Sequence, residues 1–193
     1  PGSEQFLDNM SLLSLDQLYF LENELSAALF QSILNIEKKF KTAIQYVVSK
    51  RIGTNAIDEY LKHDDHFYLS LSNESNGVKK ILTKLLKKST GYYYDTNLEP
   101  TSPIPPYKEH PSQSLKEYRR IGNVPPWTLV NDLTLGEAFM WYKSLQLKLK
   151  QEIIYLAFPR VSSRHQTYSS NINFITKSIG IIKQFRIGFA HGD

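Results

Sequence analysis

The feature that most constrains the fold is a long stretch near the N-terminus that contains neither proline nor glycine. It runs from Leu15 to Lys50, and Gly53 follows it as a stop signal. Its apolar residues recur at steps of three and four positions, which is the spacing of one helix face. They are Leu18, Leu21, Leu25, Ala28, Leu29, Ile33, Ile36, Phe40, Ile44 and Val47. The pattern predicts one long helix, or two helices with a short break between them.

Helical spacing returns in four later segments, and no sustained alternation with the period of a strand accompanies it. We predict helices over residues 56–62, 77–89, 134–158 and 170–189. Asp132 or Thr134 can cap the helix that begins at 134, with Glu137 in its first turn. Because 41% of the residues are hydrophobic, the chain can bury a core. The predicted fold class is therefore all-α, a bundle of helices.

Residues 91–126 differ in character, because they hold seven of the nine prolines. Helices cannot persist through that spacing, so we predict a long Pro-rich connection between two helical halves, with a short helix near 114–120. Tyr92, Tyr93 and Tyr94 near its start are either a stacking platform for bases or an arm packed on the core. Trp127 is predicted to anchor the core of the second half, with stacking on a base as the alternative. Residues 4–193 are interpreted as one domain, and residues 1–3 look like a cloning scar.

Composition excludes several kinds of site. The chain has no cysteine, which excludes disulfides, thiolate zinc sites and cysteine nucleophiles. His63, Asp64, Asp65 and His66 form a candidate ligand cluster, but their spacing fits no zinc or two-metal motif. We interpret them as a solvated turn and predict neither a metal nor a cofactor. No apolar run reaches the ~20 residues needed to span a bilayer and no signal peptide opens the sequence, which predicts a cytoplasmic protein without membrane contact.

The charge balance is compatible with RNA as a partner without requiring it. Lys and Arg number 23 against 19 Asp and Glu, and the isoelectric point is about 9.1. On the predicted helix 77–89, four lysines face away from the apolar side, either as a stripe that tracks a phosphate backbone or as a solvated face. The basic candidates for RNA contact are Lys80, Lys84, Lys87, Lys88, Arg119, Arg120, Arg164 and His165.

The candidate catalytic pair lies near the end of the sequence, where Arg186 and His191 are five positions apart. A regular helix would set them about 140° apart, so they converge if the helix ends near Gly188 or Ala190 and His191 turns back. A guanidinium can hold phosphate oxygens and offset the charge that develops in a transition state, while an imidazole can transfer a proton near neutral pH. RNA supplies its own nucleophile, the 2′-hydroxyl. The pair would therefore suit phosphodiester cleavage without a metal ion.

Three segments, in order, carry a resemblance to a known family. The first joins Leu21-Glu22-Asn23-Glu24-Leu25 to Ile36-Glu37-Lys38-Lys39-Phe40. The second is the block from Pro125 to Gly136, where a Pro-Trp pair leads into Leu133-Thr134-Leu135-Gly136. The third is Arg186-x4-His191, with Ala190 immediately before the histidine. Together they resemble the Abi (abortive infection) family of the HEPN superfamily.

The resemblance implies a HEPN-like helical bundle that forms a homodimer. In HEPN ribonucleases two Arg-x4–6-His motifs from two protomers form one composite cleft, so Arg186 and His191 would meet their symmetry mates. The implied role is antiphage defence by a toxin that cleaves RNA, with RNA as the substrate and a small RNA or a protein as the neutralising partner.

Two alternatives accompany that interpretation. Glu37 is expected either to contact Arg186 and position it, or to form an ordinary ion pair on the helix surface. Ile187 follows Arg186 where the family motif usually has a polar residue, most often Asn. That departure favours a second hypothesis, a non-catalytic RNA-binding or regulatory module. A third, a protein-interaction scaffold, predicts no salt-sensitive RNA affinity.

Overall fold

The structure is a computed structural model that describes residues 11–70, 76–95, 97–105, 108, 110–162 and 168–191. For residues 76, 161–162, 168–169, 171 and 187–191 it describes the course of the backbone only. The described part is mostly helical, as the sequence predicts, and one small antiparallel hairpin is added to it. No described helix is both long enough and apolar enough to cross a membrane.

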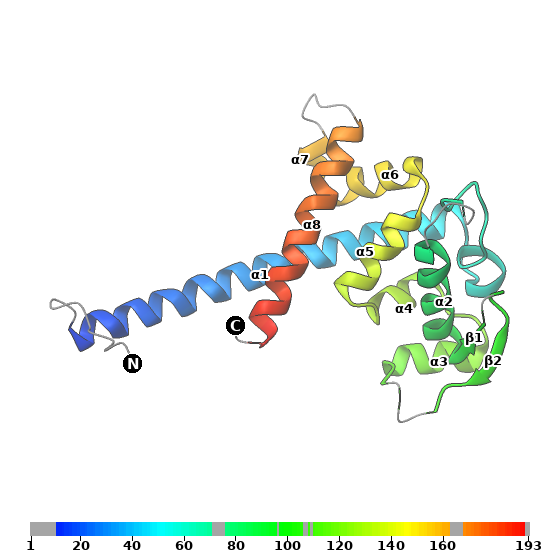
Figure 1. The fold of residues 1–193 in the computed structure, drawn as a ribbon, viewed down its shortest axis with the longest axis horizontal. Helices are drawn as coiled ribbons and strands as arrows, with labels where there is room; N and C mark the ends of the chain where they lie inside the picture. The colour runs from blue at the N-terminus through cyan, green and yellow to red at the C-terminus, as the bar shows by residue number, and fades with distance from the viewer. Residues whose placement is uncertain are drawn as a thin grey trace.

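Helix α1 (Leu12–Arg51) is a single helix of 40 residues, about 60 Å long at 1.5 Å per residue. The long-helix prediction is therefore confirmed in its unbroken form. Ser11 caps its start, because the Ser11 side chain accepts a hydrogen bond from the backbone N–H of Ser14. Lys50 and Arg51 lie in its last turn, where positive charge is favourable. Figure 1 shows that the N-terminal half of α1 extends away from the rest of the molecule.

The two halves of α1 bury very different amounts of apolar surface. From Ile33 onward, one face packs into the core, with Phe40, Ile44 and Val47 fully buried. Apart from half-buried Leu15, the segment from residue 12 to 29, here called the outer half, keeps its large apolar side chains between 46% and 87% exposed. They are Leu12, Leu13, Leu18, Tyr19, Phe20, Leu21, Leu25 and Leu29.

The segment after α1 begins with a five-residue π-helical turn, η1 (Ala56–Tyr60), where a short helix was predicted. Helix α2 (Asn76–Thr90) follows and confirms the prediction for 77–89. The Pro-rich connection then contains two strands, β1 (Tyr92–Tyr94) and β2 (Pro100–Pro103), and two short helices, α3 (Gln113–Ile121) and α4 (Pro126–Asn131). Helix α3 confirms the short helix expected near 114–120.

The hairpin was not predicted. Strand β1 pairs antiparallel with β2, so that Tyr92 lies opposite Pro103 and Tyr93 opposite Ser102. Strands of three and four residues are too short to show a period of two, and prolines at both ends of β2 argue against a strand in sequence terms. The three tyrosines therefore belong to a hairpin arm beside α2 (Figure 1).

The predicted helix over 134–158 is in fact two helices, α5 (Leu135–Ser144) and α6 (Leu147–Ala157). The break falls at Leu145 and Gln146, where no proline or glycine marks it. The backbone N–H of Gln146 donates to the Phe67 carbonyl at 2.8 Å, and its side-chain amide donates to the Tyr68 carbonyl at 2.8 Å. These bonds to the 65–68 loop replace helical ones, so a distant segment imposes the break.

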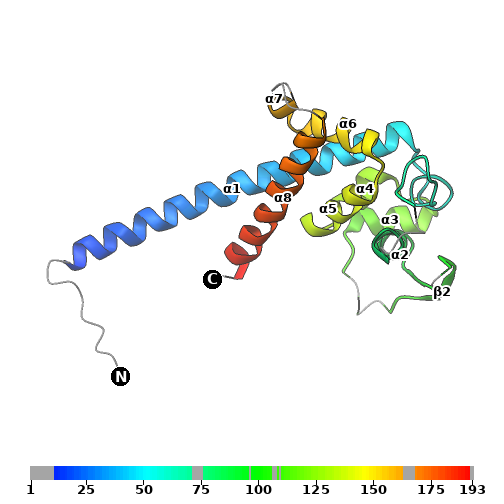
Figure 2. The ribbon, with the colours of Figure 1, turned by 45° about the horizontal axis from the view of Figure 1, so that its top comes forward.

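The chain ends in a short helix, α7 (Pro159–Ser162), and a long one, α8 (Tyr168–His191). Figures 1 and 2 show α8 crossing α1 near its middle, just past the C-terminal end of the outer half. Helix α8 also contacts α5 and α6, with Ile175 and Ile179 buried. The crossing brings residues near 186 against residues near 37.

The core is centred on Trp141, and the prediction that Trp127 anchors it was wrong. Trp141 is fully buried, whereas Trp127 on α4 remains 43% exposed. The indole N–H of Trp141 donates to the hydroxyl of Tyr68 at 3.2 Å, and that hydroxyl donates to the Tyr60 carbonyl. Tyr60 in turn donates to the Val124 carbonyl at 2.6 Å. The buried polar groups of this aromatic cluster are thus satisfied.

Candidate functional site

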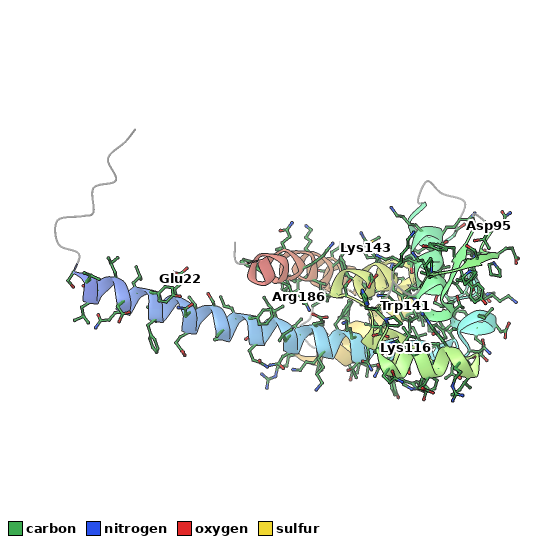
Figure 3. All side chains as sticks on the ribbon, turned by 90° about the horizontal axis from the view of Figure 1, so that it is seen from below. Glu22, Asp95, Lys116, Trp141, Lys143 and Arg186 are labelled. Carbon is green, nitrogen blue, oxygen red and sulfur yellow. The ribbon has the colours of Figure 1, made fainter. Side chains whose placement is uncertain are left out.

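The candidate site forms where α8 crosses α1, and its central contact joins Arg186 to Glu37. The guanidinium Nε of Arg186 donates to Oε2 of Glu37 at 2.7 Å. The Arg186 side chain is 38% exposed and that of Glu37 only 9%. Figure 3 shows Arg186 on the side of α8 that faces α1. Of the two expectations for Glu37, the structure shows contact with Arg186, and it shows an ion pair within α1 as well.

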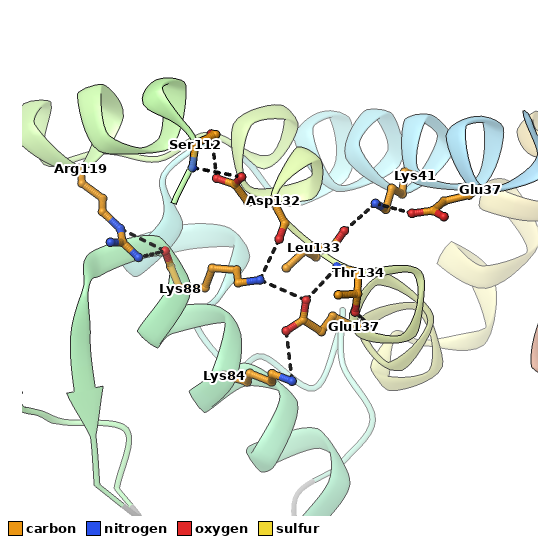
Figure 4. Close-up of polar contacts among 10 residues, drawn as sticks. All are labelled: Glu37, Lys41, Lys84, Lys88, Ser112, Arg119, Asp132, Leu133, Thr134 and Glu137. Carbon is orange, nitrogen blue, oxygen red and sulfur yellow. Dashed lines mark hydrogen bonds and ion pairs between the residues drawn. The ribbon is translucent and has the colours of Figure 1, made fainter. Parts of the chain in front are cut away.

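That second ion pair extends the site into a chain of contacts (Figure 4). Nζ of Lys41 lies 2.7 Å from Oε1 of Glu37, one helical turn further along α1. The same ammonium donates to the backbone carbonyl of Leu133. Glu37 is therefore held at both oxygens, and Lys41 links it to the segment between α4 and α5.

The electrostatics keep Glu37 ionised. Burial alone would raise its pKa, but hydrogen bonds and positive charge from Lys41 and Arg186 outweigh burial and lower it. A carboxylate that stays charged keeps the guanidinium oriented. Because Nε provides one of the five N–H donors of Arg186, the two Nη groups carry four more that a phosphate can accept.

The structure describes only the backbone of His191, the predicted partner of Arg186. Helix α8 continues to His191, so it does not end near Gly188 or Ala190 as convergence of the pair within one chain required. A regular helix sets positions 186 and 191 about 140° apart. The side chain of His191 lies outside the described residues, as do Arg164 and His165.

The block that carried the family resemblance forms the junction beside this site. Thr134 caps α5 in a capping box: its hydroxyl accepts from the Glu137 N–H at 3.2 Å, and Glu137 accepts from the Thr134 N–H at 2.8 Å. Lys88 donates to the Asp132 carbonyl at 2.7 Å. The junction of residues 132–134 is thus bonded by α2 on one side and by Lys41 of α1 on the other (Figure 4).

Glu137 has a second role that the sequence did not reveal. Its oxygens lie 3.0 Å from Nζ of Lys84 and 3.1 Å from Nζ of Lys88. Burial would raise the pKa of Glu137, but the Thr134 N–H and the two lysines lower it to about 2. Two lysines of the predicted basic stripe therefore face a buried carboxylate on α5. Neither the solvated face nor the phosphate-binding stripe describes them fully, because both also hold Glu137.

Acid should destabilise the protein through Glu137. The pKa of Glu137 falls from 4.5 to about 2 on folding. Its contribution to the free energy of unfolding is therefore complete above pH 4.5 and is lost as the pH falls toward 2. That contribution is on the order of 3 kcal/mol. We expect Glu137→Gln to be less stable at pH 7 and to lose less stability between pH 5 and pH 3. Urea unfolding at several pH values measures this, and equal pH slopes in both proteins would contradict it.

The other basic residues that the sequence suggested for RNA contact lie in different parts of the structure. Lys87 lies over the ring of Tyr93, 4.5 Å from its centroid. Nε of Arg119 donates to the Lys88 carbonyl at 3.1 Å, whereas Arg120 pairs with Glu117 at 3.3 Å on the exposed side of α3. Lys80 is exposed on α2. None of these touches Arg186 in the described part of the chain.

The histidine-rich turn is only partly solvated: the His66 side chain is 87% exposed, whereas that of His63 is 17% exposed and its ring stacks on Tyr68. His66 bonds to Asp64 at 2.8 Å, and Nε2 of His63 lies 3.2 Å from the Leu69 carbonyl. Among the described residues, no group of three or more His, Asp or Glu side chains is placed to hold a metal ion.

Lys41 and Lys183 were not singled out in the sequence. The spacing of Glu37 and Lys41, four positions on one helix, is the signal that identifies the first. Lys183 lies on α8 one turn before Arg186, and a Cβ added to Gly136 would come within 3.1 Å of its Cε. Gly136 thus leaves space for the Lys183 side chain to pass over the start of α5.

Comparison with known proteins places the chain in a family. No curated protein and no solved structure matches it. The family model described as Abi-like protein matches residues 1–193, which is the whole sequence. Its match includes the capped junction at 132–134 and both partners of the Glu37–Arg186 ion pair. The chain belongs to the family of Abi-like proteins.

Proposed function

We propose that this Abi-like protein is a HEPN-type endoribonuclease that acts in abortive infection and cleaves RNA without a metal ion. The observation that carries the proposal is the Arg186–Glu37 pair. A buried carboxylate on α1 fixes one edge of a half-exposed guanidinium on α8. An arginine held in this way is suited to bind a phosphodiester through its remaining donors.

The proposed reaction uses the RNA itself as nucleophile. The 2′-oxygen attacks the adjacent phosphorus, its proton leaves to a base, and the bond from phosphorus to the 5′-oxygen breaks as that oxygen gains a proton. Arg186 offsets the negative charge that grows on the phosphate oxygens. His191 is the proton donor or acceptor in this scheme. The products carry a 2′,3′-cyclic phosphate and a 5′-hydroxyl.

The proposal includes a homodimer with a composite site. Positions 186 and 191 lie on different sides of α8 within one chain, so a second protomer offers a route to bring an arginine and a histidine together. The outer half of α1 supports this part of the proposal, because eight large apolar side chains are exposed there. Phe174, Ile181 and Phe185 on α8 are exposed as well, at 54–57%.

The alternative, an RNA-binding module that does not cleave, draws on Ile187 and on the lysines of α2. Those lysines lie apart from Arg186, so RNA could be bound without reaching it.

Cleavage of end-labelled RNA in EDTA tests the function. The wild-type protein should cut, its products should carry the cyclic phosphate, and His191→Ala should cut at least 100-fold more slowly. His66→Ala, whose imidazole is 87% exposed, is the matched control and should cut like the wild type. Equal cutting by all three proteins would point to a contaminant. RNA bound but left intact would favour the alternative.

A further inference from the structure

Three neighbouring cavities run along α2 and share lining residues. The first, of about 310 Å³, is lined by Lys84, Lys87, Lys88, Lys108 and Arg119. The second, of about 370 Å³, shares Lys84 and adds Lys80 and Lys183. The third, of about 320 Å³, shares Arg119 with the first. Figure 4 shows Lys84 and Lys88 on α2, with Arg119 of α3 reaching the Lys88 carbonyl. The shared residues place the three cavities in a row, here called the path.

The described lining of the path is strongly basic. Among its described lining residues, seven are Lys or Arg and two, Asp132 and Glu137, are acidic. The sequence has 23 basic and 19 acidic residues. The described lining of the path therefore carries five more positive than negative charges, which is more than the surplus of four over the whole sequence. Such a surface fits a polyanion.

One end of the path is aromatic. The third cavity is lined by Tyr92 and Tyr94 of the hairpin, and Tyr92 is 45% exposed. Between them in sequence, the Tyr93 ring lies under Lys87. A positively charged groove with aromatic side chains is the usual surface for single-stranded nucleic acid, because the cations meet phosphates and the rings stack on bases.

The other end of the path leads toward Arg186. Lys183, which lines the second cavity, is three positions before Arg186 on α8, and residues at that spacing are neighbours with Cβ atoms about 5–6 Å apart. Gly136 keeps the intervening space open for the Lys183 side chain. A nucleic-acid strand bound in the second cavity would therefore contact Lys183, one helical turn from Arg186.

We infer that this basic track, defined as Lys80, Lys84, Lys87, Lys88, Lys108, Arg119 and Lys183, binds the backbone of single-stranded RNA and guides it to Arg186. The guidance rests on the proposed function, whereas binding does not. Lys84 and Lys88 also hold Glu137, so they are poor choices for substitution. Lys80 and Lys183 are exposed and contribute to the track from two different helices.

The test measures binding separately from cleavage. A fluorescent 2′-O-methyl RNA oligonucleotide, which lacks the free nucleophile, is titrated at several KCl concentrations. Lys80→Gln/Lys183→Gln should bind about tenfold more weakly at 0.1 M KCl and lower the slope of log Kd against log [KCl] by about 1.4. Lys62→Gln/Lys148→Gln removes two exposed charges elsewhere and is the matched control, expected within about twofold of the wild type.

The outcomes separate the two proposals. Equal weakening in both double variants, or none in either, would overturn the track. Displacement of the RNA by polyglutamate at matched charge would also overturn it, in favour of an acidic protein partner. If the track variant alone binds weakly and the wild type leaves unmodified RNA intact, the track stands and the ribonuclease fails. If the wild type cuts RNA but the track variant binds it normally, the ribonuclease stands and the track fails.

Discussion

Replacing Arg186 with alanine is expected to slow RNA cleavage by about 100- to 1,000-fold, the range found when a preorganised donor to a developing negative charge is removed. The fold should tolerate this change. Glu37 keeps its ion pair with Lys41, and Arg186 is partly exposed at the edge of the core. The measurement is the single-turnover rate in EDTA, with thermal unfolding as the check on folding.

Two further substitutions distinguish a catalytic arginine from a structural one. Arg186→Lys keeps the charge but removes the forked donors, so it should recover only part of the lost rate. Glu37→Gln keeps a hydrogen-bond acceptor beside Nε but loses the charge that orients the guanidinium, and a smaller loss of about tenfold is expected. A full rate for Arg186→Ala in a folded protein would remove Arg186 from the mechanism.

If the proposed dimer forms through the outer half of α1, placing glutamates there is expected to separate it and to reduce cleavage at least 100-fold. Leu21 and Leu25 are 63% and 59% exposed, so Leu21→Glu/Leu25→Glu leaves the core of the monomer untouched. Buried charge at an apolar interface is costly, because each carboxylate loses its hydration. Sedimentation should show the mass falling from a dimer to the 22.3 kDa of one chain.

The control for this experiment lies on the opposite face of the same helix segment. Asn23→Glu/Ala27→Glu adds the same two charges to exposed positions and should leave a dimer that cleaves RNA. A monomer with full activity would show that the site is complete in one chain. A dimer that persists in the Leu21→Glu/Leu25→Glu variant would place the interface elsewhere.

The sequence could predict those parts of the fold that local pattern determines. The apolar spacing over 15–50 predicted helix throughout and left open only whether it was broken, and α1 is unbroken. The contact between Glu37 and Arg186 was foreseeable as one of two options, since a lone carboxylate on the buried side of a helix needs a cation. Which cation it meets depends on the crossing of α8 over α1, and 149 positions separate the two residues.

What the sequence did not predict depends on contacts between distant segments. Trp127 and Trp141 are equally plausible as core residues in sequence terms, and only the packing of α5 against the Tyr60 and Tyr68 rings decides for Trp141. Likewise, Lys84 and Lys88 fit a solvated helix face until α5 places Glu137 beside them. The basic track combines residues from α2, α3, α8 and a loop, so no local pattern contains it.

The break between α5 and α6 couples the two halves of the chain. By its own spacing, the segment from 134 to 158 favours a continuous helix, and the hydrogen bonds that interrupt it come from residues 65–68, about eighty positions earlier. Until that loop has docked, nothing in the segment favours the interruption. The bend is therefore a tertiary feature, and Gln146 is the residue through which the first half of the chain sets the shape of the second.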